Sequence, residues 1–130
     1  MEIEKITTPN APVPGGHYTQ AIAANGFAFI SGQLPIVPGT GERIAGSIEE
    51  QTLRVLENIK VITEASGSDL SRIVKVNVYI ADIGLWDKVN TVYAEFFGSH
   101  KPARAIVPVK ELHHGFKIEM DAVAAIDQLL

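Results

Sequence analysis

Hydrophobic and polar positions alternate in three segments of the chain, and this period of two predicts β-strands. In residues 73–80 the polar positions Lys75 and Asn77 separate apolar ones, so one face of the strand is predicted to be buried. That apolar face comprises Val74, Val76, Val78 and Ile80. Residues 103–109 and 117–126 have the same spacing and predict two further strands in the second half of the chain.

Two other segments have apolar residues at helical spacing. Ser47 and Glu50 form a capping-box pattern at the start of the first helix, and Gly67 is expected just beyond its end. Asp82 is expected to cap the second helix, which runs to about Gly98. The apolar stripe of the second helix is predicted to contain Leu85, Trp86, Val89, Val92, Tyr93 and Phe96.

A hairpin is predicted near the N-terminus, because Asn25-Gly26 suits a type I′ turn between strands at 19–24 and 27–31. The resulting order of elements is ββ-α-β-α-ββ, and the length fits a single domain over residues 1–130. We therefore predict an α+β fold in which two helices pack on one face of a mixed β-sheet.

Composition narrows the possible functions. The formal net charge is −4, with 11 Lys and Arg against 15 Asp and Glu. This acidic balance makes nucleic acid an unfavoured binding partner. Cysteine is absent, so disulfides, thiolate chemistry and Cys-based zinc sites are excluded. No apolar run is long enough to span a bilayer, and the first residues do not resemble a signal peptide. A cytoplasmic location is the simplest expectation.

Arg104 is the first candidate for a functional side chain. It shares a strand face with Ile106 and Pro108, so its guanidinium should be partly desolvated and should need a partner. The planar fork of donors matches a carboxylate, and such charged hydrogen bonds contribute roughly 1.5–3 kcal/mol each. The sequence leaves open whether that carboxylate belongs to a ligand, to this chain or to a neighbouring subunit.

Glu119 is the second candidate, because it lies in the middle of the last predicted strand and could act on water as a general base or acid. The alternative is a solvated strand face shared with Lys117 and Asp121. Four further residues could line a pocket, although turn chemistry or surface exposure would also explain them: Tyr18, Ser31, Gly32 and Asn90.

The two adjacent histidines do not predict a metal site. On an extended segment His113 and His114 would point to opposite faces, and no metal-binding spacing accompanies them. The sequence also lacks a Gly-rich phosphate loop and a nucleophile elbow, so we predict no metal and no cofactor.

Many short segments, each weak alone, agree in order and spacing with one known family. They are Asn10-Ala11-Pro12, Gly16-His17-Tyr18-Thr19-Gln20, Ser31-Gly32-Gln33-Leu34-Pro35, Gly41-Glu42, Glu50-Gln51-Thr52, Val74-Lys75, Val89-Asn90-x-x-Tyr93-x-x-Phe96-Phe97, Pro102-Ala103-Arg104 and Lys117-Ile118-Glu119. Over nearly its whole length the chain resembles the RidA family, also called the YjgF family, of reactive intermediate imine deaminases.

The resemblance implies a chorismate-mutase-like α+β fold and a homotrimer with pockets in the clefts between subunits. It implies cofactor-free hydrolysis of 2-imine or 2-enamine acids to 2-keto acids and ammonia. In this family Arg104 would hold the substrate carboxylate and Glu119 would position water. The other expected pocket residues are Tyr18, Ser31, Gly32, Asn90 and Ile106.

Three departures from the family pattern bear on substrate preference. His17 stands where the family usually has Pro, and Ile106 stands where some members have Cys. The usual Leu-Pro-x-Gly-like stretch reads Leu112-His113-His114-Gly115. Two alternative functions stay open: a non-catalytic protein that binds small molecules or regulates another process, and an endoribonuclease or translation inhibitor.

Overall fold

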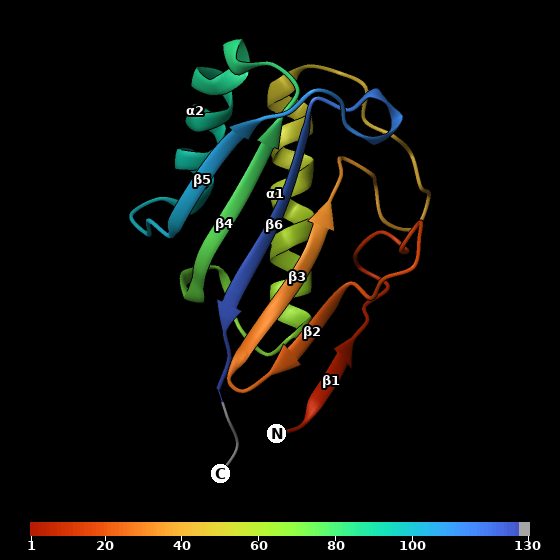
Figure 1. The fold of residues 1–130 in the computed structure, drawn as a ribbon, viewed down its shortest axis with the longest axis vertical. Helices are drawn as coiled ribbons and strands as arrows, with labels where there is room; N and C mark the ends of the chain where they lie inside the picture. The colour runs from red at the N-terminus through yellow and green to blue at the C-terminus, as the bar shows by residue number, and fades with distance from the viewer. Residues whose placement is uncertain (128–130) are drawn as a thin grey trace.

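The computed structural model describes residues 1–127, which form six strands, two α-helices and three short 3-10 turns (Figure 1). The strands and α-helices are β1 (Ile3–Ile6), β2 (Ala21–Ala24), β3 (Phe27–Gln33), α1 (Ile48–Ala65), β4 (Ile73–Ile80), α2 (Trp86–Phe97), β5 (Ala103–Pro108) and β6 (Ile118–Ala125). The 3-10 turns are η1 (Leu70–Arg72), η2 (Ile83–Leu85) and η3 (His113–Gly115).

The six strands form one mixed sheet in the order β1-β2-β3-β6-β4-β5. Only β4 and β5 are parallel among these pairs, because α2 carries the chain back to the same end of the sheet before β5 begins. Both helices lie behind the sheet in Figure 1, on one face. The predicted α+β fold with two helices on one face of a mixed sheet is confirmed.

The strand β1 is the element that the sequence analysis missed. It pairs antiparallel with β2, from Ile3 opposite Ala24 to Ile6 opposite Ala21, and it forms one edge of the sheet. Three of its four residues are exposed, and only Ile6 is buried. An edge strand this short has little hydrophobic alternation to reveal it.

The predicted start of the first helix and end of the second are confirmed by backbone geometry, whereas Asp82 caps the short turn before the second helix and not that helix itself. Ser47 is extended, and its hydroxyl accepts a hydrogen bond from the Glu50 amide at 3.1 Å. Asp82 accepts from the Gly84 amide at 2.7 Å, which caps η2, and α2 continues directly from that turn. Gly98 ends α2 with φ of 65°, a conformation that favours glycine.

The hairpin between β2 and β3 also follows the prediction. Asn25 and Gly26 have φ of 52° and 84°, as a type I′ turn requires, and Ala24 pairs with Phe27 across it.

The predicted inward face of β4 is wrong at one position. Val74 is 42% exposed, whereas Ile73 is buried. The pairing with β6 shifts register between Ile73 and Lys75, which is a β-bulge. One extra residue at a bulge moves a side chain off the face that simple alternation assigns to it.

The hydrophobic core lies between the helices and the face of the sheet that carries Val76, Val78 and Met120. No helix of residues 1–127 covers the opposite face, where Phe27 is 41% and Phe29 49% exposed. Neither α-helix described here is long and apolar enough to cross a membrane.

Candidate functional site

Arg104 lies on the edge strand β5, opposite Val76 of β4, and its side chain therefore points to the helix-covered face. Its Nη1 donates a hydrogen bond to Oδ1 of Asn90 at 2.9 Å. The guanidinium carbon lies 4.8 Å from the ring centroid of Tyr93 and 5.6 Å from that of Trp86. An amide and two aromatic rings thus hold the guanidinium while most of its donors stay available.

Arg104 has no carboxylate within 4.0 Å among the residues that the structure describes. Instead it borders a cavity of about 470 Å³, which Lys101 and His100 also line. The positive charge of Arg104 and Lys101 and the unused guanidinium donors favour an anionic occupant. The structural ion pair that the sequence left open is therefore not formed within residues 1–127.

Tyr93 forms the floor beneath Arg104 and is only 6% exposed. Burial raises the pKa of its phenol to about 12, although the nearby positive charge of Arg104 acts in the opposite direction. The ring is therefore neutral at physiological pH, and it stacks under the cation without competing for it as a counter-ion.

Glu119 lies on β6 opposite Tyr79 of β4, on the face of the sheet that the helices leave uncovered. Gly32 of β3 lies directly beside it. A Cβ atom at Gly32 would meet Oε2 of Glu119 and lie 3.1 Å from its Cδ. Glycine at position 32 thus leaves the space that the carboxylate occupies.

A second cavity, of about 390 Å³, opens next to Glu119. Its lining residues are Tyr18, Ser31, Gly32, Leu34, His113 and Glu119. The Ser31 hydroxyl donates to the Thr19 carbonyl at 2.6 Å, so its oxygen can act towards a ligand only as an acceptor. Four residues that the sequence analysis singled out separately (Tyr18, Ser31, Gly32 and Glu119) therefore line one cavity.

The environment of Glu119 favours its protonated form. Partial burial raises the pKa of the carboxyl, the negative charge of Asp121 raises it further, and His113 acts in the opposite direction. Asp121 is itself fixed by hydrogen bonds from Asn77 Nδ2 at 2.8 Å and from the Tyr79 hydroxyl at 2.9 Å. A carboxyl with a raised pKa is a stronger base when it is ionised.

Replacing Asp121 with Asn should lower the pKa of Glu119, because it removes the like charge that raises this pKa. Any activity that needs ionised Glu119 should then extend to lower pH. A titration of Glu119 by NMR in both proteins measures the shift. Asp87→Asn, on an exposed turn of α2, is the matched control and should leave the titration unchanged. An unchanged Glu119 pKa in Asp121→Asn would contradict this account.

One chain does not bring Arg104 and Glu119 into the same cavity. Strands β5 and β6 flank β4 on opposite sides, and the two side chains point to opposite faces of the sheet. Ile106 lies opposite Val78 and shares the face of Arg104. We call Asn90, Arg104 and Ile106 the Arg104 half-site. We call Tyr18, Ser31, Gly32 and Glu119 the Glu119 half-site.

Residues 113–114 do not form the extended segment in which the two histidines would point to opposite faces. Both histidines lie in η3, where His114 has φ of 60°, and their rings stack with centroids 3.6 Å apart. His113 consequently faces the cavity of Glu119. Gly115 directly after the two histidines is the sequence signal that could have indicated a turn.

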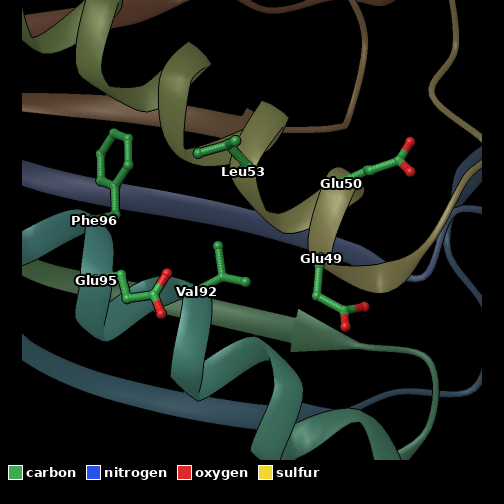
Figure 2. A pocket seen from close by; sticks show the side chains of 6 residues that line it. All are labelled: Glu49, Glu50, Leu53, Val92, Glu95 and Phe96. Atoms are coloured by element: carbon green, nitrogen blue, oxygen red, sulfur yellow. The ribbon is translucent and has the colours of Figure 1, made fainter.

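A third cavity, of about 440 Å³, lies between α1 and α2 (Figure 2). Figure 2 shows Glu95 on one side of this groove and Glu49 on the other, with Leu53 and Phe96 nearby, while the Glu50 carboxylate points away from them. Three carboxylates would repel an anionic ligand, so this groove is not an alternative to the cavity of Arg104.

Comparison with known proteins identifies the family. The family model described as Endoribonuclease L-PSP matches residues 8–126. The chain belongs to this family, the YjgF/RidA family. A RutC family protein of Pyrococcus horikoshii is 52% identical over 121 residues, which cover 93% of this chain and 96% of the relative.

Two further members of the YjgF/RidA family bear on function. Reactive Intermediate Deaminase A, chloroplastic, of Arabidopsis thaliana is 40% identical over 95% of this chain and 66% of its own length. The crystal structure of E. coli TdcF with bound serine has a TM-score of 0.90 and 35% identity, and covers 95% of this chain and 99% of that one. The family and fold expected from the sequence are thus confirmed.

Proposed function

We propose that this protein hydrolyses 2-imino and 2-enamino acids to 2-keto acids and ammonia. The observation that carries the proposal is the pair of half-sites. One offers a guanidinium that no carboxylate of residues 1–127 neutralises, and the other offers a carboxyl with a raised pKa. Together they supply a carboxylate anchor and a base for water, which are the two groups that this hydrolysis needs.

The half-sites would meet between chains, in a homotrimer with equivalent sites at its clefts. Phe27 and Phe29 on the uncovered sheet face supply apolar surface for such contacts. In a closed ring each chain presents its Arg104 half-site to one neighbour and its Glu119 half-site to the other. Every cleft then contains one complete set of groups.

The chemistry follows from this arrangement. Arg104 binds the substrate carboxylate through its free donors, with Asn90 holding the guanidinium in place. The imine carbon of the protonated substrate is electrophilic. Glu119 accepts a proton from water as the water oxygen bonds to that carbon, which yields a carbinolamine. The carbinolamine nitrogen then gains a proton, the C–N bond breaks, and ammonia leaves with the bonding electron pair. The hydroxyl loses its proton, and the oxygen forms the carbonyl of the 2-keto acid.

Two relatives support this assignment. The Arabidopsis relative carries the name of a reactive intermediate deaminase. The TdcF crystal structure contains serine, a small amino acid whose carboxylate resembles that of the proposed substrate. The chain also lacks cysteine, as suits a reducing cytoplasm, where we propose that the reaction takes place.

The direct test generates an imino acid in situ with a pyridoxal-phosphate-dependent dehydratase and follows 2-keto acid formation. We expect the protein to accelerate this step above the uncatalysed rate by roughly 10²-fold or more, the scale of acid–base assistance. A protein that binds 2-ketobutyrate without any acceleration would instead be a non-catalytic binding protein.

Mixing two inactive variants tests the sharing of the site. Chains with Arg104→Ala keep the Glu119 half-site, and chains with Glu119→Gln keep the Arg104 half-site. If they are refolded together in equal amounts, about one quarter of the clefts should be complete, since each half-site is intact with about even odds. Activity should therefore return to about a quarter of the unmodified level.

The matched control mixes Arg104→Ala with a chain that carries both substitutions, and it should stay inactive. If the two single variants also stay inactive when mixed, the cleft is not shared between chains.

Endoribonuclease activity is the second candidate, because the family model carries that description. The net charge of −4 and the acidic groove between α1 and α2 disfavour a polyanion. RNA cleavage that survives Arg104→Ala and further purification would support it.

A further inference from the structure

The cavity of the Glu119 half-site contains an ionisable group that the proposed mechanism has not used. His113 lines this cavity together with Glu119 and Tyr18. Imidazole is the side-chain group that most often transfers protons in catalysis. Of these groups, His113 is therefore the one suited to donate a proton to a leaving amine.

The turn η3 holds this imidazole in a defined place. The Phe116 amide donates to the His113 carbonyl at 3.2 Å, and Phe116 is buried. The His113 ring stacks on that of His114 with an angle of 21° between the planes, and the His114 ring contacts Phe116 edge-on at 5.9 Å. This arrangement places His114 at φ of 60°, a strained backbone conformation that residues other than glycine rarely adopt.

Electrostatics links His113 to the proposed base. The positive form of His113 lowers the pKa of Glu119, against the larger effects of burial and of Asp121. The second imidazole is less suited to the same task. Partial desolvation, together with the positive charges of Arg43 and His113, lowers the pKa of His114, which makes His114 the weaker acceptor for a proton from Glu119.

We propose that His113 carries the proton from Glu119 to the nitrogen that leaves. This inference rests on the proposed function and adds a catalytic residue to it. After water attacks, Glu119 holds the proton that the water lost. Neutral His113 takes that proton and becomes an imidazolium, and Glu119 is again a carboxylate.

The second half of the cycle releases ammonia. The imidazolium of His113 donates its proton to the carbinolamine nitrogen while Glu119 accepts the hydroxyl proton. The C–N bond breaks, its electron pair stays on nitrogen, and the former O–H pair forms the C=O bond. Glu119 finally gives its proton to ammonia or to water, so one protonated imine and one water yield a 2-keto acid and ammonium.

The test is the variant His113→Ala in the dehydratase-coupled assay. We expect the acceleration to fall about 10- to 100-fold, since general acid assistance is lost, while the affinity for 2-ketobutyrate stays within about twofold. Added imidazole should restore much of the rate, because it can occupy the vacated space and carry the same proton. A residue that only stacks on its neighbour would give no such rescue.

Two further variants keep the test decisive. His113→Gln keeps the size and the hydrogen-bonding capacity of the side chain but cannot carry a proton, so it should be as slow as His113→Ala, with unchanged thermal unfolding. Asn at position 114 is compatible with the same backbone conformation but removes the ring that stacks on His113. His114→Asn should therefore lose less activity than His113→Ala and show no rescue by imidazole.

The outcomes separate this inference from the proposed function. An active unmodified protein with an equally active His113→Gln variant would overturn the role of His113 alone. A loss of activity in His113→Ala that imidazole does not restore would also overturn it. An unmodified protein without any acceleration would overturn both proposals.

Discussion

Arg104→Ala should lower the catalytic efficiency towards 2-imino acids by about 10²- to 10⁴-fold, the largest effect that we expect from any single substitution. The guanidinium is fixed by Asn90 and stacked near Tyr93, yet it keeps donors for a ligand. Two charge-assisted hydrogen bonds at roughly 1.5–3 kcal/mol each account for a loss of this size. The dehydratase-coupled assay measures the rate, and calorimetry with 2-ketobutyrate measures the lost affinity.

Two variants serve as controls for this result. Arg104→Lys keeps the charge but loses the planar fork, so an intermediate activity is expected. Arg72→Ala removes an arginine that pairs with Asp127 at 2.8 Å at the surface, and it should leave activity unchanged. If Arg104→Ala kept nearly full activity and affinity, the carboxylate anchor would have to be assigned to another residue.

Glu119→Gln should give the second largest effect, a drop in turnover of about 10²-fold with nearly unchanged affinity for 2-ketobutyrate. The amide fills the same space beside Gly32 but cannot accept the proton of the attacking water. Asp121→Asn also removes a carboxylate from this face but leaves the proposed base in place, so it should keep its turnover at neutral pH and change only the acid side of the pH profile. A Glu119→Gln protein with normal turnover would rule out this base.

The pH dependence of the unmodified protein should follow the same carboxyl. Burial and the charge of Asp121 raise the pKa of Glu119 above its ordinary value of 4.5. Because the base acts in its ionised form, activity should decline as the pH falls through that raised pKa. The decline should therefore occur at a higher pH than for an ordinary glutamate, and Glu119→Gln should lose this limb of the profile.

The stability of the fold should fall with rising pH in the range where activity rises. A carboxyl whose pKa is raised by folding keeps its proton to higher pH in the folded chain than in the unfolded one. Its ionisation therefore destabilises the fold as the pH rises from 4.5 through the raised value, and this effect is absent below that window. Glu119→Gln should accordingly melt at a higher temperature than the unmodified protein at pH 7, and at a similar temperature under acidic conditions.

Local sequence signals predicted most elements of the fold, because each one depends on neighbouring residues. The Ser47 cap and the Asn25-Gly26 turn are examples, since both are decided within a few positions. Strand β1 and the bulge at Val74 were not predicted, because their structure depends on pairing with strands far along the chain.

Pairing between distant segments also limited what the sequence could predict about the candidate site. The period of two correctly put Arg104 and Ile106 on one face of their strand. It could not show that Glu119 points to the other face of the sheet, because that relation depends on how β4, β5 and β6 pair. The position of His113 beside Glu119 depends on a left-handed conformation at His114, which histidine adopts only in particular contexts.

The separation of Arg104 and Glu119 by the thickness of a sheet has a consequence for the cell. In the proposed trimer a newly synthesised polypeptide is inert until it meets its partners. The concentration of active trimer then rises more steeply than the concentration of polypeptide. If the chain is expressed below the concentration at which trimers form, almost no active enzyme is present.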